Sequence, residues 1–404
     1  MIPEIRIEDY NYRLPDNRIA KYPLPERDSS KLLVYNSQAE IKETIFRDLP
    51  ELLPSNAIMV FNDTKVVPAR LHFRRASGAR IEIFCLAPLD PNEYNIAFSS
   101  TEHCVWKCVI GNSKRWKDDI LTYDSEGGPK ALEAINLRAK LVDRDGQTGA
   151  VEFIWDGGVP FSSVLEYCGQ VPIPPYLNRK TEDIDVVRYQ TTYAHIRGSV
   201  AAPTAGLHFT EEVIQKIKDK GIETETVCLH VGAGTFLPVK SSLVSEHPMH
   251  REPFTVSLDF LKRLRDAGKK VIAVGTTSIR TLESLYYIGA SCLEQGEPRD
   301  VEQWAPYIRP YGYSLKESLS AIISYLEKHG LTELKAGTRI IIVPGFQFRV
   351  VDMCVTNFHQ PESTLILLVS AFVGGDWRRI YDYALSHDFR FLSYGDSSIL
   401  TRKD

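Results

Sequence analysis

Apolar residues follow two different rhythms along the chain. Between about residues 71 and 153, short runs of alternating apolar and polar residues are separated by Gly, Asp, Asn and Pro, which is typical of short antiparallel strands and turns. After about residue 160, short β-branched apolar runs alternate with longer segments whose apolar residues recur at helical spacing. This second rhythm predicts a mainly parallel sheet with helices on both faces.

We therefore expect an α/β fold in which a small β module interrupts a larger unit. The large domain, with a mainly parallel sheet, would be formed by residues 1–70 and 155–404. The inserted domain, a small antiparallel β-barrel or sandwich, would be formed by residues 71–154.

Several elements of the α/β part can be placed on the sequence. An apolar run from Ala57 predicts a buried strand, and the segment 210–221 predicts a helix between a threonine N-cap and a glycine stop. The runs at 339–345 and 389–396 are strand-like. The apolar run at 364–373 has about half of the ~20 residues that a membrane-spanning helix requires, so it predicts a buried helix and no membrane segment.

Composition narrows the class of protein. With 43% hydrophobic and 25% charged residues, the chain is an ordinary globular protein, and disordered, collagenous and fibrous classes are excluded. The cysteines are scattered without a CxxC pair, so the sequence encodes neither a disulfide framework nor a zinc knuckle. Cys104 and Cys108 lack a third cysteine because residue 111 is Gly, which argues against radical iron–sulfur chemistry. Acids near the start do not fit a secretory signal, so we expect a cytoplasmic protein.

The densest polar motif is PTAGLHFT at 203–210. A turn at Gly206 places Thr204 and His208 just before a predicted helix N-terminus, where free N–H groups and the helix dipole favour a polar ligand. A histidine that only caps a turn is the alternative.

HVGAGTF at 230–236 follows a predicted strand. Gly232 and Gly234 would let a ligand approach the backbone closely, beside His230. The motif lacks the third glycine of a dinucleotide fingerprint. A plain tight turn and a methyltransferase-type pocket remain alternatives.

HPMHRE at 247–252 offers His250 and Glu252 to a substrate. Its proline argues against the helical HExxH geometry of a metal site, so we expect no metal. A polar surface loop is the alternative.

GTTSIRTLES at 275–284 follows a buried strand. Its hydroxyls and charged groups suit an anion such as a carboxylate at a helix start. The candidate residues are Thr276, Thr277, Ser278, Arg280 and Glu283. The alternative is a helix cap followed by an ordinary ion pair.

Polar residues also end other predicted strands. Asn357 and His359 follow one apolar strand, at the edge where α/β sheets bind ligands. Asp63 and Asp396 occupy turns of the same kind, although each could merely form an Asx-turn.

Basic residues gather on the β module, and we consider two readings of them. They could track nucleic-acid phosphates or simply be solvated strand faces. The group comprises Arg70, His72, Arg74, Arg75 and Arg80, followed by Lys107, Lys114, Arg115 and Lys117.

Taken together and in order, these motifs resemble one family. FNDTKVVPARL, GSVAAPTAGLHFT, LHVGAGTFLPV, VIAVGTTSIRTLES and TNFHQPESTLILLVSAF are similar to stretches of the S-adenosylmethionine:tRNA ribosyltransferase-isomerase family of the queuosine pathway. The resemblance runs from about residue 10 to residue 400 and is weaker between about 85 and 155 and between 285 and 338.

The resemblance implies a monomer with an inserted β-barrel and a larger α/β domain. The reaction would transfer and rearrange the ribosyl part of S-adenosylmethionine, as co-substrate, onto 7-aminomethyl-7-deazaguanine at the wobble position of a tRNA partner. Epoxyqueuosine-tRNA would form, and adenine and methionine would leave.

This chemistry suggests a role for a histidine. A sulfonium donor acidifies the hydrogens of its 5′ carbon, and a neutral imidazole is suited to removing one at pH 7. His208 is the first candidate, and His230 and His359 are the alternatives.

Other roles can be matched to the remaining motifs. The acceptor amine needs a carboxylate to orient it, such as Asp63, Asp396 or Glu252. Departing adenine needs a hydrogen-bond donor, for which Asn357 is a candidate, and the methionine carboxylate suits the cluster at 276–280.

The chain departs from the family pattern at three positions. Lys65 stands where Arg is usual, Phe346 where Tyr is common, and Gln360 where Leu is usual. These changes keep open the alternative of a paralogous S-adenosylmethionine-dependent transferase with a different acceptor. A non-catalytic RNA-binding protein of the same fold is a further alternative.

Overall fold

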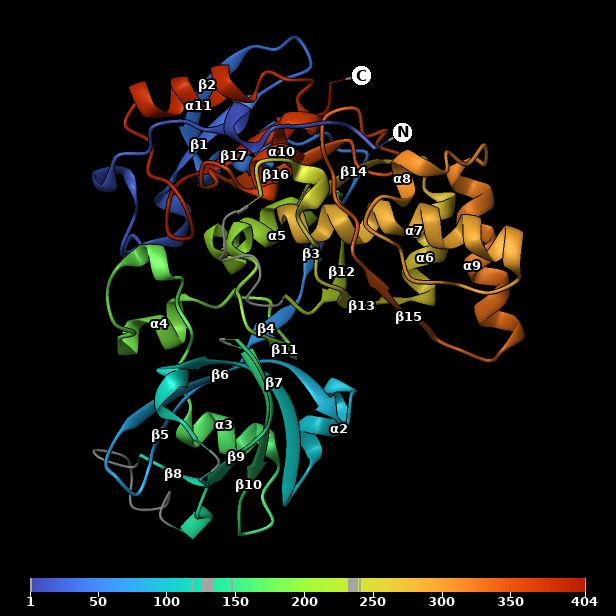
Figure 1. Ribbon diagram of the computed structural model, residues 1–404. Coiled ribbons are helices and arrows are strands. Elements are labelled where there is room, and N and C mark those ends of the chain that lie inside the picture. The colour runs from blue at the N-terminus through green and yellow to red at the C-terminus, as the bar shows by residue number, and fades with distance from the viewer. Residues whose placement is uncertain are drawn as a thin grey trace.

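The computed structural model contains a large α/β body and a smaller barrel (Figure 1). Both ends of the chain lie on the α/β body, away from the barrel (Figure 1). The α/β class and the inserted antiparallel barrel are confirmed. The structure describes residues 2–117, 119–124, 134–146, 148–231, 239 and 241–403, with the side chains of Asn95 and Arg197 left aside.

A nine-stranded mixed sheet forms the centre of the α/β body. Parallel pairing joins β12, β3, β14 and β16, and also β17 and β1, whereas the remaining pairs are antiparallel. The strands in spatial order are β15 (Glu333–Thr338), β13 (Glu252–Ser257), β12 (Glu223–Leu229), β3 (Ala57–Asn62), β14 (Lys270–Val274), β16 (Met353–Asn357), β17 (Ser397–Thr401), β1 (Lys31–Tyr35) and β2 (Ile41–Ile45).

Helices cover both faces of this sheet. The helices of the α/β body are α1 (Leu49–Leu52), α4 (Asp183–Arg188), α5 (Glu211–Asp219), α6 (Leu258–Asp266), α7 (Gly275–Gln295), α8 (Ala305–Ile308), α9 (Leu315–Lys328), α10 (Thr364–Phe372) and α11 (Trp377–Ser386). All six residues of β3 are buried because alternate side chains enter different cores. Ile58 and Val60 pack in the core of α6, α7 and α9, whereas Met59 and Phe61 pack in the core of α1 and α5.

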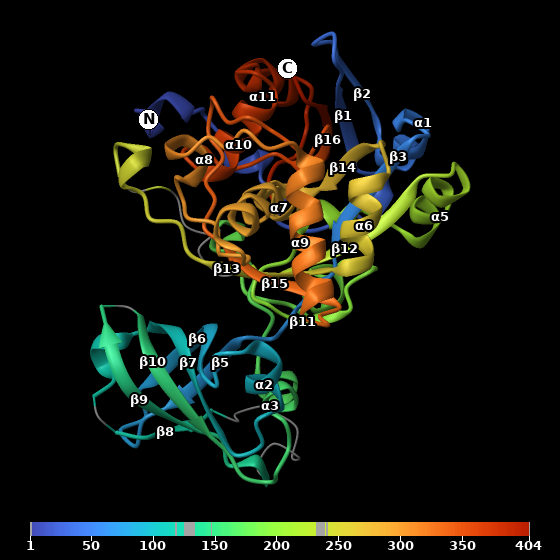
Figure 2. The same cartoon turned by 90° about the vertical axis from the view of Figure 1, so that its right-hand side faces the viewer.

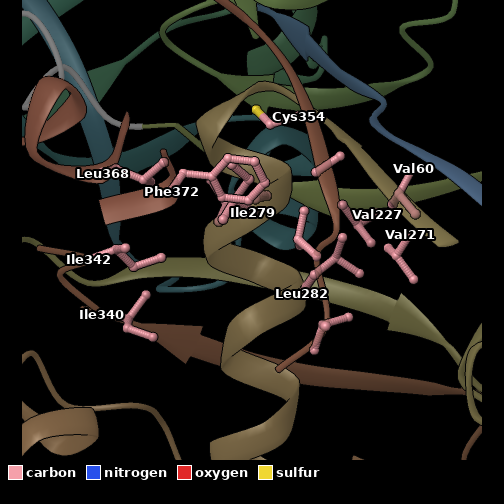
Figure 3. Close-up of a cluster of buried hydrophobic side chains, with 14 of the residues drawn as sticks. Val60, Val227, Val271, Ile279, Leu282, Ile340, Ile342, Cys354, Leu368 and Phe372 are labelled. Atoms are coloured by element: carbon pink, nitrogen blue, oxygen red, sulfur yellow. The ribbon is translucent and has the colours of Figure 1, made fainter. Parts of the chain in front are cut away.

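The long helix α7 lies in the larger core. Figure 3 shows Ile279 and Leu282 of α7 between strand residues such as Val227 and Phe372 of α10. Because α7 starts directly after β14, this packing fixes the position of its N-terminus at the sheet edge.

The barrel is closed by six antiparallel strands in the order β10, β7, β6, β5, β8, β9. Helix α3 (Phe161–Cys168) contributes its apolar face to the barrel core, and α2 (Tyr94–Ser99) packs on the outside near β6. The barrel strands are β5 (Arg70–Arg74), β6 (Arg80–Asp90), β7 (His103–Gly111), β8 (Leu121–Tyr123), β9 (Arg138–Asp145) and β10 (Thr148–Ile154). The division of the chain at residues 71 and 154 stays a prediction.

A short parallel pair connects the two bodies. β4 (Thr64–Val66) leaves the sheet after β3 and leads towards the barrel, and it pairs with β11 (Ile196–Ser199), which follows α4. Figures 1 and 2 both show these strands between the barrel and the α/β body.

Two predicted strands are wrong. In the segment 339–345, residues 340–343 are buried, but the segment forms no strand because the ladder with β13 ends at the pair Glu252–Thr338. Its Arg339 and Ile341 N–H groups donate instead to the carbonyls of Val301 and Gln303, at 2.8 and 3.3 Å. The segment 389–396 lies before β17 and turns at Leu392, which has a positive φ of 71°. Both segments are apolar because they fill the core.

The helix predicted at 210–221 is α5, and the Thr210 side chain caps it by accepting the Val213 N–H. The apolar run near the C-terminus is the buried helix α10. In the described residues, every helix is too short or too polar to cross a membrane. All seven cysteines are buried and unpaired.

Candidate active site

A cleft opens at the carboxyl edge of the parallel strands, where α/β sheets commonly bind ligands. The N-terminus of α7 meets the end of β16 there, and the space measures about 750 Å³ with its opening to solvent. Its polar lining comprises Tyr176, Tyr189, Thr204, Thr276, Thr277, Thr356, Asn357, His359, Gln360, Ser363 and Ser393. The cleft thus brings together five of the residues predicted from sequence: Thr204, Thr276, Thr277, Asn357 and His359.

Three polar atoms of the lining are buried without a hydrogen-bond partner in the described part of the chain. They are Thr277 Oγ1, Asn357 Oδ1 and Tyr189 Oη. The Asn357 side-chain amide donates to the Leu392 carbonyl at 3.0 Å, so the side-chain oxygen of Asn357 is turned away from Leu392. An unpaired buried polar group costs roughly 1–3 kcal/mol, so these atoms suit a ligand that pairs with them.

His359 is fixed in the cleft wall through its backbone and ring. Its N–H donates to Tyr381 Oη at 3.0 Å, its carbonyl accepts from the Tyr12 hydroxyl, and its Nε2 lies 3.1 Å from Thr356 Oγ1. Burial lowers the pKa of the His359 imidazole to about 4, so the ring is neutral at pH 7.

A second cavity of about 280 Å³, with its opening to solvent, adjoins the cleft and shares Ser393 with it. His208 lines this cavity; its Nδ1 lies 2.8 Å from Ser30 Oγ, and its Nε2 is buried without a partner in the described residues. Burial lowers the pKa of His208 to about 4, an effect that nearby Asp396 and Asn357 partly oppose. The result is a neutral imidazole beside the Asn357 side chain.

The turn before His208 requires glycine at position 206. A Cβ there would lie 1.9 Å from Tyr193 Oη. Gly206 therefore shapes the turn that carries Thr204 and His208, and its role is steric.

Asp396 is engaged on both oxygens. It accepts the Lys31 N–H at 3.1 Å, the Arg390 N–H at 2.7 Å and Arg390 Nη2 at 2.9 Å. The carboxylate therefore holds Arg390 at the second cavity.

His230 lies where the barrel meets the α/β body. Its ring stacks on Tyr94 of α2, and its Nδ1 is buried without a partner in the described residues. Burial lowers the pKa of His230 to about 4. Gly198 has φ +148°, and a Cβ on it would lie 2.4 Å from Nδ1, so only glycine admits the ring here.

Asp63 sits beyond β3, outside the cleft lining. Its Oδ1 is buried without a partner among the described residues, and burial raises the pKa of the carboxyl group, while Thr226 and His195 oppose this. Its backbone carbonyl accepts from the N–H of His195 at 2.9 Å.

Arg280 and Glu252 form a buried ion pair. Arg280 also donates from Nε to the Ile340 carbonyl at 3.1 Å, and Ser278 donates to the Val274 carbonyl at 2.8 Å. The structure therefore separates these three predicted residues from the cleft and gives each a partner within the protein.

Glu283 is also remote from the cleft lining. Its carboxylate accepts backbone N–H groups of residues 349, 350 and 351 at 2.9–3.1 Å. Burial raises the pKa of Glu283 to about 7, against these hydrogen bonds. His250 is exposed on a loop. Gly232 and Gly234 lie outside the described residues.

Five of the nine basic residues of the barrel named above lie against three carboxylates. Arg70 and His72 lie within 3.5 Å of Glu82, and Arg75 pairs with Asp119 at 2.8 Å. Arg74 and Arg80 pair with Asp124 at 2.8 and 2.9 Å. These pairs favour the reading of solvated strand faces over a phosphate-tracking stripe.

No group of three or more His, Cys, Asp and Glu side chains in the described ranges could hold a metal ion. The expected independence from metal stays a prediction.

Comparison with known proteins shows the family of this chain. Residues 7–400 match the family described as queuosine biosynthesis protein. This chain belongs to the queuosine biosynthesis family. The S-adenosylmethionine:tRNA ribosyltransferase-isomerase of Halothermothrix orenii is 37% identical over 402 residues, covering 98% of this chain and 100% of that protein. Its namesake from Trichlorobacter lovleyi is 38% identical over 400 residues, covering 98% and 99%. A crystal structure of the S-adenosylmethionine tRNA ribosyltransferase of Thermotoga maritima is 28% identical, covers 97% of this chain and 99% of that one, and has a TM-score of 0.46.

The three departures from the queuosine-family pattern lie in different surroundings. Gln360 lines the cleft. Phe346 packs in the core beside Tyr287, with ring centroids 6.4 Å apart. Lys65 lies in β4, in register with residue 197 of β11.

Several residues of this family member's two cavities escaped the sequence analysis. Tyr176 and Ser393 share a 2.5 Å hydrogen bond across the cleft wall, although they are 217 positions apart. Arg27 and Arg188 line the second cavity. The motifs PIPPYL, RYQTTYA and PERDSS, which contain or adjoin these residues, were the available signal.

Proposed function

We propose that this protein transfers and isomerises the ribosyl part of S-adenosylmethionine onto 7-aminomethyl-7-deazaguanine at the wobble position of tRNA. The product is epoxyqueuosine-tRNA, with adenine and methionine released. Full-length relatedness to two enzymes named for S-adenosylmethionine:tRNA ribosyl transfer supports this. The observation that carries the proposal is one cleft in which polar residues from three distant motifs leave buried atoms for a ligand.

Donor binding is assigned to the N-terminus of α7 and the end of β16. The first N–H groups of α7 and the hydroxyls of Thr276 and Thr277 suit the methionine carboxylate. Asn357 is assigned to the nucleobase, because its free oxygen can accept from the exocyclic amine of adenine.

His208 is proposed as the base that removes the acidified 5′ proton of the sulfonium donor. It is neutral at pH 7, and Nε2 carries the free lone pair when Nδ1–H donates to the Ser30 hydroxyl. His359 is the alternative inside the cleft, although its Nε2 already faces Thr356.

Asp63 is proposed to orient the acceptor amine. Among the three carboxylates considered, Asp396 and Glu252 already bind arginines, whereas Asp63 keeps an unpartnered oxygen in the described structure. The expected cytoplasmic location and monomeric state are part of the same proposal.

The test is a turnover assay with S-adenosylmethionine and tRNA that carries the deazaguanine precursor. Adenine release is followed by chromatography, and the modified nucleoside is identified by mass spectrometry after digestion of the tRNA. Stoichiometric adenine and epoxyqueuosine are expected, and tRNA with guanine at the wobble position is the control. Release only with another acceptor would support a paralogous transferase, and tRNA binding without release would support a non-catalytic protein.

A further inference from the structure

The second cavity is lined by three arginines from distant parts of the chain. Arg27 comes from the N-terminal segment, Arg188 from the end of α4, and Arg390 from the loop after α11. Ser393 belongs to the linings of both this cavity and the cleft, so the two spaces are neighbours.

Two of these guanidinium groups have no carboxylate partner in the described structure. Arg27 donates to the carbonyls of Leu207 and Val187, at 3.0 and 3.1 Å. Arg188 donates to the carbonyls of residues 24 and 25, at 2.7 and 3.1 Å, and its Nε is buried without a partner. Backbone carbonyls orient the guanidinium groups but do not neutralise their positive charges.

The surrounding charges also leave Arg27 and Arg188 without a neutralising partner in the described structure. Burial and the nearby Arg188 lower the pKa of Arg27, so the two cations repel each other across the cavity. Arg390 forms an ion pair with Asp396 at 2.9 Å, and the nearby Asp185 forms an ion pair with Arg179 at 2.7 Å. Keeping two like charges close and partly desolvated is unfavourable unless an anion joins them.

The wall of this cavity is buried, as His208 shows. Its side chain is 5% exposed and lines the cavity, with Nε2 unpartnered in the described part of the molecule. The group that suits an anion is Arg188 Nε, a buried donor that has no partner in the described structure, whereas the Nε2 lone pair of a neutral His208 would accept a hydrogen bond. Fixed cations and a buried unpartnered donor make this a built site rather than a patch of surface arginines.

We infer that Arg27, Arg188 and Arg390 form a binding site for a backbone phosphodiester of the acceptor RNA. This inference rests on the proposed function and assigns a subsite to it. A nucleotide's phosphate is linked to its base through one ribose, so a base extruded into the cleft brings a phosphate to the adjoining cavity. Arginine forks match the paired oxygens of a phosphodiester.

A carboxylate offers the same chemistry, and the donor's methionine carries one. That carboxylate is accompanied by an ammonium group on the same carbon and by the sulfonium. None of the described residues that line the cavity carries a carboxylate, and the nearby Asp396 is already bound to Arg390 and the Lys31 N–H. A phosphodiester brings no positive charge, so it is the better match.

The experiment measures binding of precursor-bearing tRNA by fluorescence anisotropy across a KCl series. We expect R27Q/R188Q to raise the Kd at least tenfold and to lower the slope of log Kd against log[KCl] by about one, since the loss of one neutralised phosphate removes about 0.7–0.9. R265Q removes an exposed arginine of α6 and is the matched control, with Kd and slope unchanged.

Lysine variants separate binding from folding, because Arg27 and Arg188 also hold backbone carbonyls. R27K and R188K keep the charge without the fork, so we expect a wild-type salt slope with a Kd raised several-fold. Their thermal unfolding midpoints should match that of the wild type. Their Kd values for S-adenosylmethionine should lie within twofold of the wild-type value.

The remaining outcomes overturn the inference. Unchanged tRNA binding by the double variant, in a wild type that binds tRNA and releases adenine, refutes the phosphate site and leaves the proposed function standing. If R27Q/R188Q binds S-adenosylmethionine more weakly than the wild type does, but binds the decarboxylated donor equally well, the cavity is assigned to the methionine carboxylate. A wild type that neither binds tRNA nor turns over refutes the proposed function itself, together with the site.

Discussion

The imidazole of His230 lies flat against the phenol ring of Tyr94, with ring centroids 4.5 Å apart and ring planes 15° from parallel. His230 follows a strand of the central sheet, whereas Tyr94 begins α2 beside the barrel. The contact therefore fixes the barrel against the segment that leads from β12 to Val231 in the cleft wall. The insert thus supports one side of the candidate site.

Removing the Tyr94 ring should loosen this support. We expect Tyr94→Ala to lower the free energy of unfolding by about 2–4 kcal/mol, because a large buried ring and its stacking partner are lost. kcat/KM should fall by roughly tenfold, while Tyr94→Phe keeps both quantities near wild type. Urea unfolding and steady-state adenine release measure the two effects, and an unchanged Tyr94→Ala would argue against a supporting role.

His208 can be tested as the general base. His208→Gln should reduce kcat by about 10²–10⁴, with the Kd for S-adenosylmethionine changed by less than about threefold. His329→Gln, on the exposed end of α9, is the control. A larger loss of kcat in His359→Gln than in His208→Gln would transfer the role to the residue inside the cleft.

The buried histidines predict how stability depends on pH. The pKa values of His208, His230 and His359 are lowered to about 4 in the folded protein, against about 6.5 when unfolded. Between these values the unfolded chain binds more protons, so stability is lost as the pH falls from 6.5 towards 4. Glu283 acts in the opposite direction, because its folded-state pKa is raised to about 7.

With three histidines against one glutamate, we expect a net loss of roughly 2–4 kcal/mol between pH 6.5 and pH 5. Urea unfolding at half-unit pH steps measures it. Glu283→Gln should make the dependence steeper, because it removes the opposing group. Stability that stays level or rises as the pH falls would contradict the burial of neutral imidazoles.

The Arg280–Glu252 pair should act on stability rather than on donor binding. Removing one partner leaves a buried charge, so Arg280→Gln is expected to cost about 3–5 kcal/mol. Arg263→Gln breaks an exposed pair with Glu225 and should cost less than about 1 kcal/mol. Calorimetric titration of the folded Arg280→Gln protein should give a near wild-type Kd, and a loss of donor affinity without destabilisation would restore Arg280 to the site.

The sequence was sufficient for the two-part architecture because each body has its own periodicity. The antiparallel strands of the barrel alternate, and α5 has its Thr210 cap and polar face in the local sequence. The strand prediction failed at 339–345 because burial alone makes a run of residues apolar, whereas a strand also needs a partner strand in register.

The candidate site was predictable mainly where a motif ends a strand, and Thr204, in the turn before α5, is the exception. Thr276, Thr277 and Asn357 reach the cleft because β14 and β16 are neighbours with their ends at one edge. Arg280, one turn into α7, faces Glu252 instead, and that partner is set by tertiary packing. Arg27 shows the reverse case, since only the fold brings it beside residues far along the chain.

The most direct measurement is a crystal structure with S-adenosylmethionine bound. We predict its methionine carboxylate at the N-terminus of α7, near Thr277, and its adenine within hydrogen-bonding distance of Asn357. The 5′ carbon should face His208 or His359. Donor density outside the cleft, with Thr277 and Asn357 untouched, would contradict the account.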